Sequence, residues 1–164
     1  MSPTIDVLVR LGATVLAVPA MTFAVSSRAE PTGAPVKACA AYRAGQEGVI
    51  RTFCSGRGVA HIKLDGREHV VSGGVCDLVA GSLAFNAGVV LGPAATVSPD
   101  YFGVAVPKMG PFSGAVLAVR LDGRDYLLMQ NSGAVDAHGG SFQASGHVVG
   151  NGREPAKVSG TFTC

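Results

Sequence analysis

The chain has 164 residues with 13 Lys or Arg and 11 Asp or Glu, so its formal net charge is +2 at pH 7. No block of like charges is present, which excludes the electrostatic footprint of a nucleic-acid-binding protein. Charged residues make up only 15%, glycine occurs 23 times and tryptophan is absent, a composition typical of a turn-rich all-β domain.

Residues 1–29 have the pattern of a secretory signal peptide. Arg10 precedes an uncharged run from Leu11 to Ser26 that is short for a membrane-spanning helix and is followed by small residues. An uncleaved signal anchor is the alternative, because the charge bias before the run is weak. Residues 30–37 contain proline and glycine without periodicity and are expected to be a tether. Residues 38–164 are then expected to form a single β domain that is exported in either case.

Four cysteines in an exported chain predict two disulfides rather than a metal site or a catalytic thiol. Of the three possible pairings we favour Cys39 with Cys54, which flank one short segment, and Cys76 with Cys164. In the chain-entropy model the short loop contributes about 3 kcal/mol and the long loop about 4–5 kcal/mol to the free energy of unfolding.

The second pairing follows from the expected facing of the side chains. In the last eight residues, Cys164 shares the apolar parity of Phe162, and Cys76 shares the parity of Val70 and Leu78. Both cysteines are therefore expected to face a core. A bridge between them would join the end of the chain to an early part of the domain.

Alternation of apolar and polar residues and the turn signals between them predict eight or nine short strands. Asp65-Gly66 and Asp122-Gly123 each predict a type I′ hairpin turn, whereas residues 107–111 and 131–140 are expected to be breaks or loops. The expected fold is an all-β antiparallel β-sandwich or open barrel of about eight short strands, closed by disulfides. The expected strands are residues 49–54, 59–64, 68–79, 82–92, 101–107, 115–121, 125–130, 141–148 and 157–164.

Several short motifs together resemble those of the LpqH-type mycobacterial lipoprotein antigen family. They are Asp65-Gly66, the segment Ser72-Gly73-Gly74-Val75-Cys76, the strand from Phe142 to Gly150, and the closing Phe162-Thr163-Cys164. The resemblance covers roughly residues 59–164. It implies an exported, envelope-associated antigen with a disulfide-closed β domain, no established enzyme activity, and recognition by a host receptor through a lipid anchor.

The chain departs from the family at that anchor. The family carries a lipidated cysteine directly after the apolar signal, but here the first cysteine is Cys39, well beyond Ser26 and preceded by Lys37. A soluble secreted form is therefore expected, with the membrane reached only through the signal or through a lipid anchor.

The weakly patterned middle of the chain has apolar residues on both parities, as at Leu127-Leu128-Met129. A strand that is apolar on both faces is either buried centrally or lines a cavity, and core packing is the favoured interpretation. An apolar pocket that accepts an envelope lipid is the alternative. Its candidate lining residues are Phe85, Val89, Leu91, Phe102, Val104 and Leu128.

Two groups of residues could carry other chemistry. His61 and His69 flank the first hairpin, but a metal site would need further ligands, and solvated strand histidines are the favoured interpretation. Asp136-Ala137-His138 lies near two serines, Ser132 and Ser141, yet neither serine has a nucleophile-elbow pattern around it.

Together with the export signal, the resemblance implies a non-enzymatic protein of the cell envelope or the secreted fraction, and we expect no cofactor or metal. Its expected partner is a host receptor or an envelope lipid, and its expected role is at the surface. A carrier that holds an apolar envelope lipid between its sheets is the alternative function. A hydrolase that uses Ser132 or Ser141 with His138 and Asp136 ranks below both.

Overall fold

The computed structural model describes residue 39 and residues 41–150 and 154–164. The expected signal, residues 1–29, and the tether, residues 30–37, lie outside these residues. Across the described ranges, no helix has the length and apolar character needed to span a membrane. The ten strands are β1 Val49–Phe53, β2 Gly58–Leu64, β3 Arg67–Val79, β4 Ser82–Leu91, β5 Tyr101–Val106, β6 Gly110–Ser113, β7 Val116–Leu121, β8 Arg124–Asp136, β9 Gly139–Val148 and β10 Pro155–Thr163.

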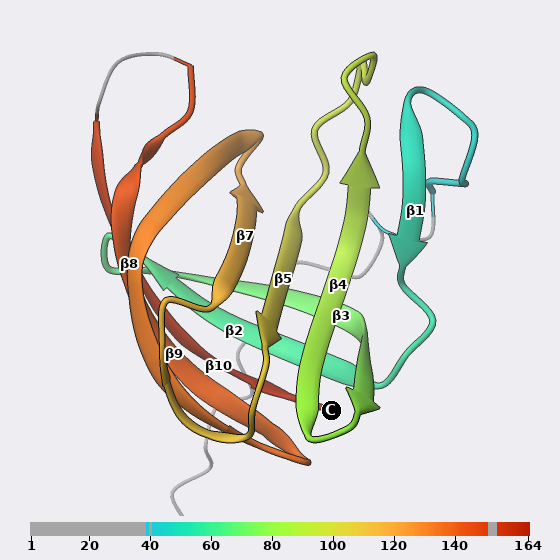
Figure 1. Ribbon diagram of the computed structural model, residues 1–164. Coiled ribbons are helices and arrows are strands. Elements are labelled where there is room, and N and C mark those ends of the chain that lie inside the picture. The colour runs from blue at the N-terminus through green and yellow to red at the C-terminus, as the bar shows by residue number, and fades with distance from the viewer. Residues whose placement is uncertain (1–38, 40, 151–153) are drawn as a thin grey trace, which may run out of the picture. The chain divides into compact units, whose positions relative to one another are not determined.

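Eight of the strands form a closed antiparallel barrel in the order β4-β3-β2-β10-β9-β8-β7-β5, and β5 pairs back onto β4. The pairing of β4 with β5, which closes the barrel, places Phe85 opposite Val104. Strand β1 pairs with β4 and β6 pairs with β8 outside this circle. Figure 1 shows β7, β5 and β4 in front of β2 and β10, which cross behind them. The all-β antiparallel prediction is confirmed, and of the two expected architectures the structure is nearer to the barrel, although the barrel is closed and not open.

The barrel interior is a continuous apolar core. Along β2, Ala60, Ile62 and Leu64 are buried while the intervening His61 and Lys63 are exposed, which is the alternation of a strand with one inner face. Four phenylalanine rings from four strands meet inside, with ring centroids between 4.9 and 6.2 Å apart. Burial of each such side chain contributes about 1.5–3 kcal/mol, so this cluster is a main source of stability. The four residues are Phe85, Phe102, Phe142 and Phe162.

Cys39 is bonded to Cys54 and Cys76 to Cys164, the pairing favoured from the sequence. Two disulfides indicate an oxidising, extracytoplasmic environment. Only one of the two cysteine side chains of the long bridge faces the core as expected. Cys76 is half-buried against the core, but Cys164 is exposed, because β10 ends at Thr163 and the last residue lies beyond the barrel.

A bulge in β3 explains why Val70 does not share the face of Cys76. Gly58 pairs with Gly74 and Val59 with Ser72, so Gly73 is an extra residue, and its φ of 85° is accessible to glycine. Because of this extra residue, the positions of β3 that face the core change from odd to even numbers across the bulge. Val70 therefore lies opposite the exposed His61, on the outer side of the barrel.

Both Asp-Gly turns are confirmed, since positive φ occurs at both central residues: 46° and 90° at Asp65-Gly66, and 52° and 72° at Asp122-Gly123. The expected loop at residues 131–140 is instead the second half of β8, a turn and the start of β9. Part of the expected break at residues 107–111 belongs to β6. Gly133 pairs with Phe112 of β6, whose ring covers it, so a glycine here permits close strand contact rather than a loop.

Candidate binding surface

The six residues expected to line an apolar pocket do not surround one common space. Phe85 and Phe102 are 0% exposed, and Val104 and Leu128 join them in the packed core of the barrel. Val89 is buried where β4 pairs with β1, and Leu91 is half-buried at the end of the same strand. The inner positions that were candidates for a lipid pocket are thus occupied by side chains in contact, as expected for core packing.

The two histidines lie on opposite sides of the sheet. His61 is exposed on the outer face, whereas His69 pairs with the inward-facing Ile62 and is half-buried. The His69 Nδ1 atom is 3.9 Å from Asp122 Oδ1, and its Nε2 atom is buried without a hydrogen-bond partner in the described part of the chain. No group of three or more metal-ligating side chains occurs among the residues described.

The Asp136 and His138 pair stabilises a turn. The backbone N–H of His138 donates to Asp136 Oδ1 over 2.7 Å, which is an Asx-type contact within the β8–β9 hairpin. Ser141 pairs with Ala134 on the outer face, and Ser132 accepts a hydrogen bond from Gln143 Nε2 at 3.2 Å. Within the described residues, no hydrogen bond joins the His138 ring to either serine, so the geometry does not form a Ser/His/Asp triad.

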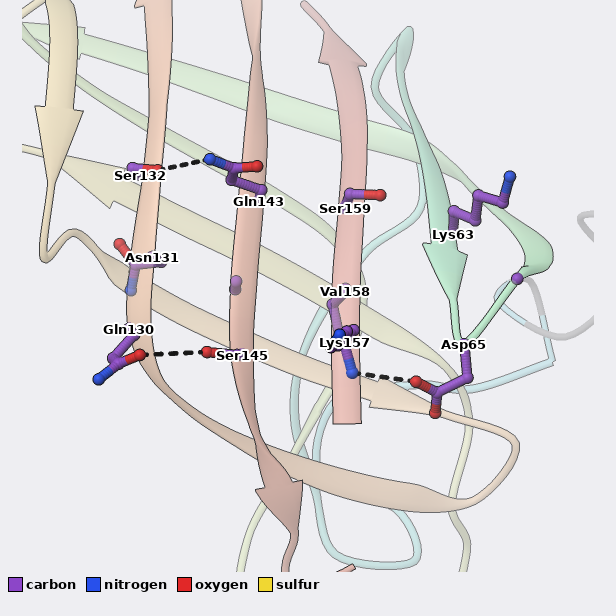
Figure 2. A pocket seen from close by; sticks show the side chains of 12 residues that line it. Lys63, Asp65, Gln130, Asn131, Ser132, Gln143, Ser145, Lys157, Val158 and Ser159 are labelled. Carbon is purple, nitrogen blue, oxygen red and sulfur yellow. Dashed lines mark hydrogen bonds between the residues drawn. The ribbon is translucent and has the colours of Figure 1, made fainter. Parts of the chain in front are cut away.

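An open hollow of about 670 Å³ lies on the outer side of β8, β9, β10 and β2. These four strands are neighbours in the barrel, and Figure 2 shows their side chains arranged in two rows across them. The rows arise from the same alternation that builds the core. Because every second residue of each strand faces inward, the residues between them face outward at the same height on adjacent strands.

The first row contains two hydroxyls, an amide and an ammonium group. Ser132 of β8 pairs with Gln143 of β9, Gln143 with Ser159 of β10, and Ser159 with Lys63 of β2. At about 4.8 Å between strands, the row is about 14 Å long. It continues onto β6, where Ser113 pairs with Ser132.

The second row lies two residues along the strands, about 7 Å from the first. Gln130 pairs with Ser145, whose hydroxyl donates to Gln130 Oε1 over 3.4 Å, and Ser145 pairs with Lys157. A register shift in β8 between Leu128 and Gln130 allows this pairing. The row ends at Asp65, whose Oδ1 accepts the backbone N–H of Lys157 at 3.0 Å.

The charge of the hollow is weakly positive. Lys63 and Lys157 contribute two ammonium groups, and Asp65 contributes the one carboxylate among the described lining residues. Among the described residues, neither lysine has a carboxylate oxygen within 4 Å. Both ammonium groups are therefore available to an external ligand.

A second cluster of polar side chains lies at the β7–β8 turn. The backbone N–H of Asp122 donates to Asp100 Oδ1 over 3.1 Å. Burial raises the pKa of Asp100, this hydrogen bond lowers it, and the Asp122 carboxylate raises it further. Nearby, the Tyr101 hydroxyl donates to Asn86 Oδ1, and burial raises the pKa of Tyr101.

Comparison with protein-family models, curated proteins and solved structures finds no match to this chain. The resemblance to the lipoprotein antigens therefore rests on the motifs quoted above. The function is argued from the geometry of the barrel and its outer surface.

Sequence reasoning predicted the outward facing of Lys63 and of the polar residues of the last two strands, but it expected Ser132 in a loop and did not bring these residues together. The outward parity of Gln143 and Ser145, and of Lys157 and Ser159, was evident from the alternation in the last two strands. Their relation to Lys63 was missed, because the pairing of β2 with β10 joins residues from opposite ends of the domain. The available signal was three alternating strands whose outward positions carry hydroxyl, amide or ammonium groups.

Proposed function

We propose that the protein is an exported, non-enzymatic module of the cell envelope or the secreted fraction. It binds a partner through the polar wall, defined as the outward residues Ser132, Gln143, Ser159, Lys63, Gln130, Ser145 and Lys157. The resemblance to mycobacterial lipoprotein antigens supports the surface role, and the two disulfides support an extracytoplasmic location.

One observation favours binding at the outside over carriage inside. The barrel centre is filled by the four phenylalanine rings, with Phe85 and Phe162 centroids 4.9 Å apart, whereas the hollow lies on the outer wall. A packed small barrel has no room for a lipid without loss of core contacts. A rigid barrel that presents polar side chains on paired strands is suited to recognition, because its binding groups are held before the partner arrives.

The export part of the proposal is tested by intact-mass measurement of the protein from its native host, with and without reduction. A start near Ser27 or Glu30 and a gain of four hydrogens on reduction are expected, since two disulfides are present. An acylated N-terminal Cys39 would break the first bridge and make the protein a lipoprotein. A reduced protein in the cytosolic fraction would contradict export.

The binding part is tested by cosedimentation of the oxidised protein with envelopes purified from the same host. Ser145→Glu places a longer, negatively charged side chain beside Lys157 in the middle of the wall and should abolish cosedimentation. Ser98→Glu introduces the same side chain at an exposed loop position outside the wall and is the control. Equal sedimentation of the two variants would show that the wall is not the binding surface.

A further inference from the structure

We infer that the polar wall binds an extended, weakly acidic polysaccharide whose chain runs across β8, β9, β10 and β2. The inference rests on the proposed function and names the class of ligand for that site. Its first support is the type of groups in the wall. Hydroxyl, carboxamide and ammonium side chains form hydrogen bonds with sugar hydroxyls as donors, as acceptors or as both.

The two amides of the wall are held in place, yet each keeps free hydrogen-bonding groups. Gln143 uses one N–H for Ser132 Oγ, which leaves its carbonyl oxygen as an acceptor. Gln130 accepts from the Ser145 hydroxyl through its carbonyl oxygen, which leaves its NH₂ as a donor. The two amides are therefore oriented before a ligand binds, which reduces the side-chain entropy that they lose on binding.

The spacing of the wall fits a linear polymer. Successive side chains in the first row lie about 4.8 Å apart, a distance comparable with the length of one pyranose unit in an extended chain. Each unit of such a chain can therefore contact one strand. A second row about 7 Å away can contact substituents on the far side of the sugar rings.

The positive charge of the hollow favours sugars that carry an anionic substituent. Lys63 and Lys157 lie on adjacent strands, while the Asp65 carboxylate already accepts the Lys157 backbone N–H. The net attraction is thus for an anionic substituent near the β2–β10 end of the row, such as the carboxylate of a uronic acid. Because the lysines are exposed, this attraction is modest and decreases with salt.

Other macromolecules fit the wall less well. None of the outward side chains of the two rows is aromatic, so the surface lacks the stacking platforms of single-stranded nucleic-acid sites. The rows also lack the exposed aromatic or aliphatic anchors that dominate most protein interfaces. The larger exposed apolar residues Val116 and Met129 lie outside the hollow.

The inference is tested by isothermal titration of the full-length oxidised protein with three probes: hexagalacturonate, maltohexaose and hexametaphosphate. Hexagalacturonate should bind more tightly than maltohexaose by at least tenfold. The double variant Lys63→Ala/Lys157→Ala should remove that difference in affinity. Gln143→Ala should weaken the binding of both hexasaccharides several-fold. Gln46→Ala and Lys108→Ala, exposed residues of the same types outside the wall, should leave binding unchanged.

Absence of binding to either hexasaccharide would overturn the inference. Tighter binding of hexametaphosphate that is insensitive to Gln143→Ala would also overturn it, because charge alone would then explain the site. These failures are distinguishable from failure of the proposed function. If Ser145→Glu still blocks cosedimentation with envelopes while no sugar binds, the wall is a binding surface for a different ligand.

Discussion

Removal of the Cys76–Cys164 disulfide should destabilise the protein more than removal of the Cys39–Cys54 disulfide. The bridges close loops with sequence separations of 88 and 15 residues. In the chain-entropy model the long loop stabilises the folded state by about 4–5 kcal/mol and the short loop by about 3 kcal/mol. The expected difference between Cys76→Ala/Cys164→Ala and Cys39→Ala/Cys54→Ala is therefore about 1.5 kcal/mol.

The folded structure supports the assumption that the long bridge acts mainly on the unfolded chain. Strand β10 is paired on both sides, with β2 and with β9, and the backbone N–H of Cys164 donates to the His138 carbonyl at 2.9 Å. These contacts remain when the bridge is removed. Cys76, Cys39 and Cys54 are all half-buried, so a truncation cost on the order of 1 kcal/mol occurs in both variants and the difference between them rests on loop length.

Guanidinium denaturation of the oxidised proteins, followed by circular dichroism, measures both effects. The long-bridge variant should have the lower midpoint, and its dependence of free energy on denaturant should be steeper because its unfolded chain is more expanded. A short-bridge variant that loses as much stability as the long-bridge variant, or more, would refute the loop-entropy argument for this barrel.

Three further substitutions, with Met129→Ala as an exposed control, test the packing of the core and the ionisation of the Asp100 carboxyl group. Phe102→Ala removes a fully buried ring and should cost about 3–5 kcal/mol in the free energy of unfolding, whereas Met129→Ala, at a side chain 71% exposed, should cost little. Gly133→Ala places a Cβ against the Phe112 ring and the backbone of β9, and thermal unfolding should show a marked loss of stability; an unchanged melting temperature would contradict the close contact. Burial raises the pKa of Asp100 above its unfolded value, so its stabilising contribution is present below the unfolded pKa and is lost as the pH rises through the folded pKa. Asp100→Asn should therefore gain stability relative to the wild type between acidic and neutral pH, and parallel curves of unfolding free energy against pH would contradict this.

Local patterns in the sequence predicted much of the secondary structure. The Asp65-Gly66 and Asp122-Gly123 turns depend only on residues that tolerate positive φ, and both are present. Most strands agree with the alternation of apolar and polar residues, since facing within a strand depends on near neighbours. The wall residues of β9 and β10 were on the predicted outward parity for the same reason.

Apart from the Cys76–Cys164 bridge, features that depend on contacts between distant parts of the chain were not predicted. The bulge at Gly73 changed the facing of Val70, and β6 pairs with β8 where the Phe112 ring lies over Gly133. Neither event leaves a periodic signal, because a bulge interrupts the period and glycine carries no side chain to alternate.

The sequence by itself determined that the chain is all-β, where most strands lie and which side of β2, β9 and β10 is polar. Only the tertiary structure decided that β5 pairs with β4 to close the barrel and that β2 lies beside β10. Backbone hydrogen bonds between strands are nearly the same whichever strands pair, so strand order is set by how the whole core packs. That order brings Lys63 into line with Ser159, Gln143 and Ser132, and so creates the wall.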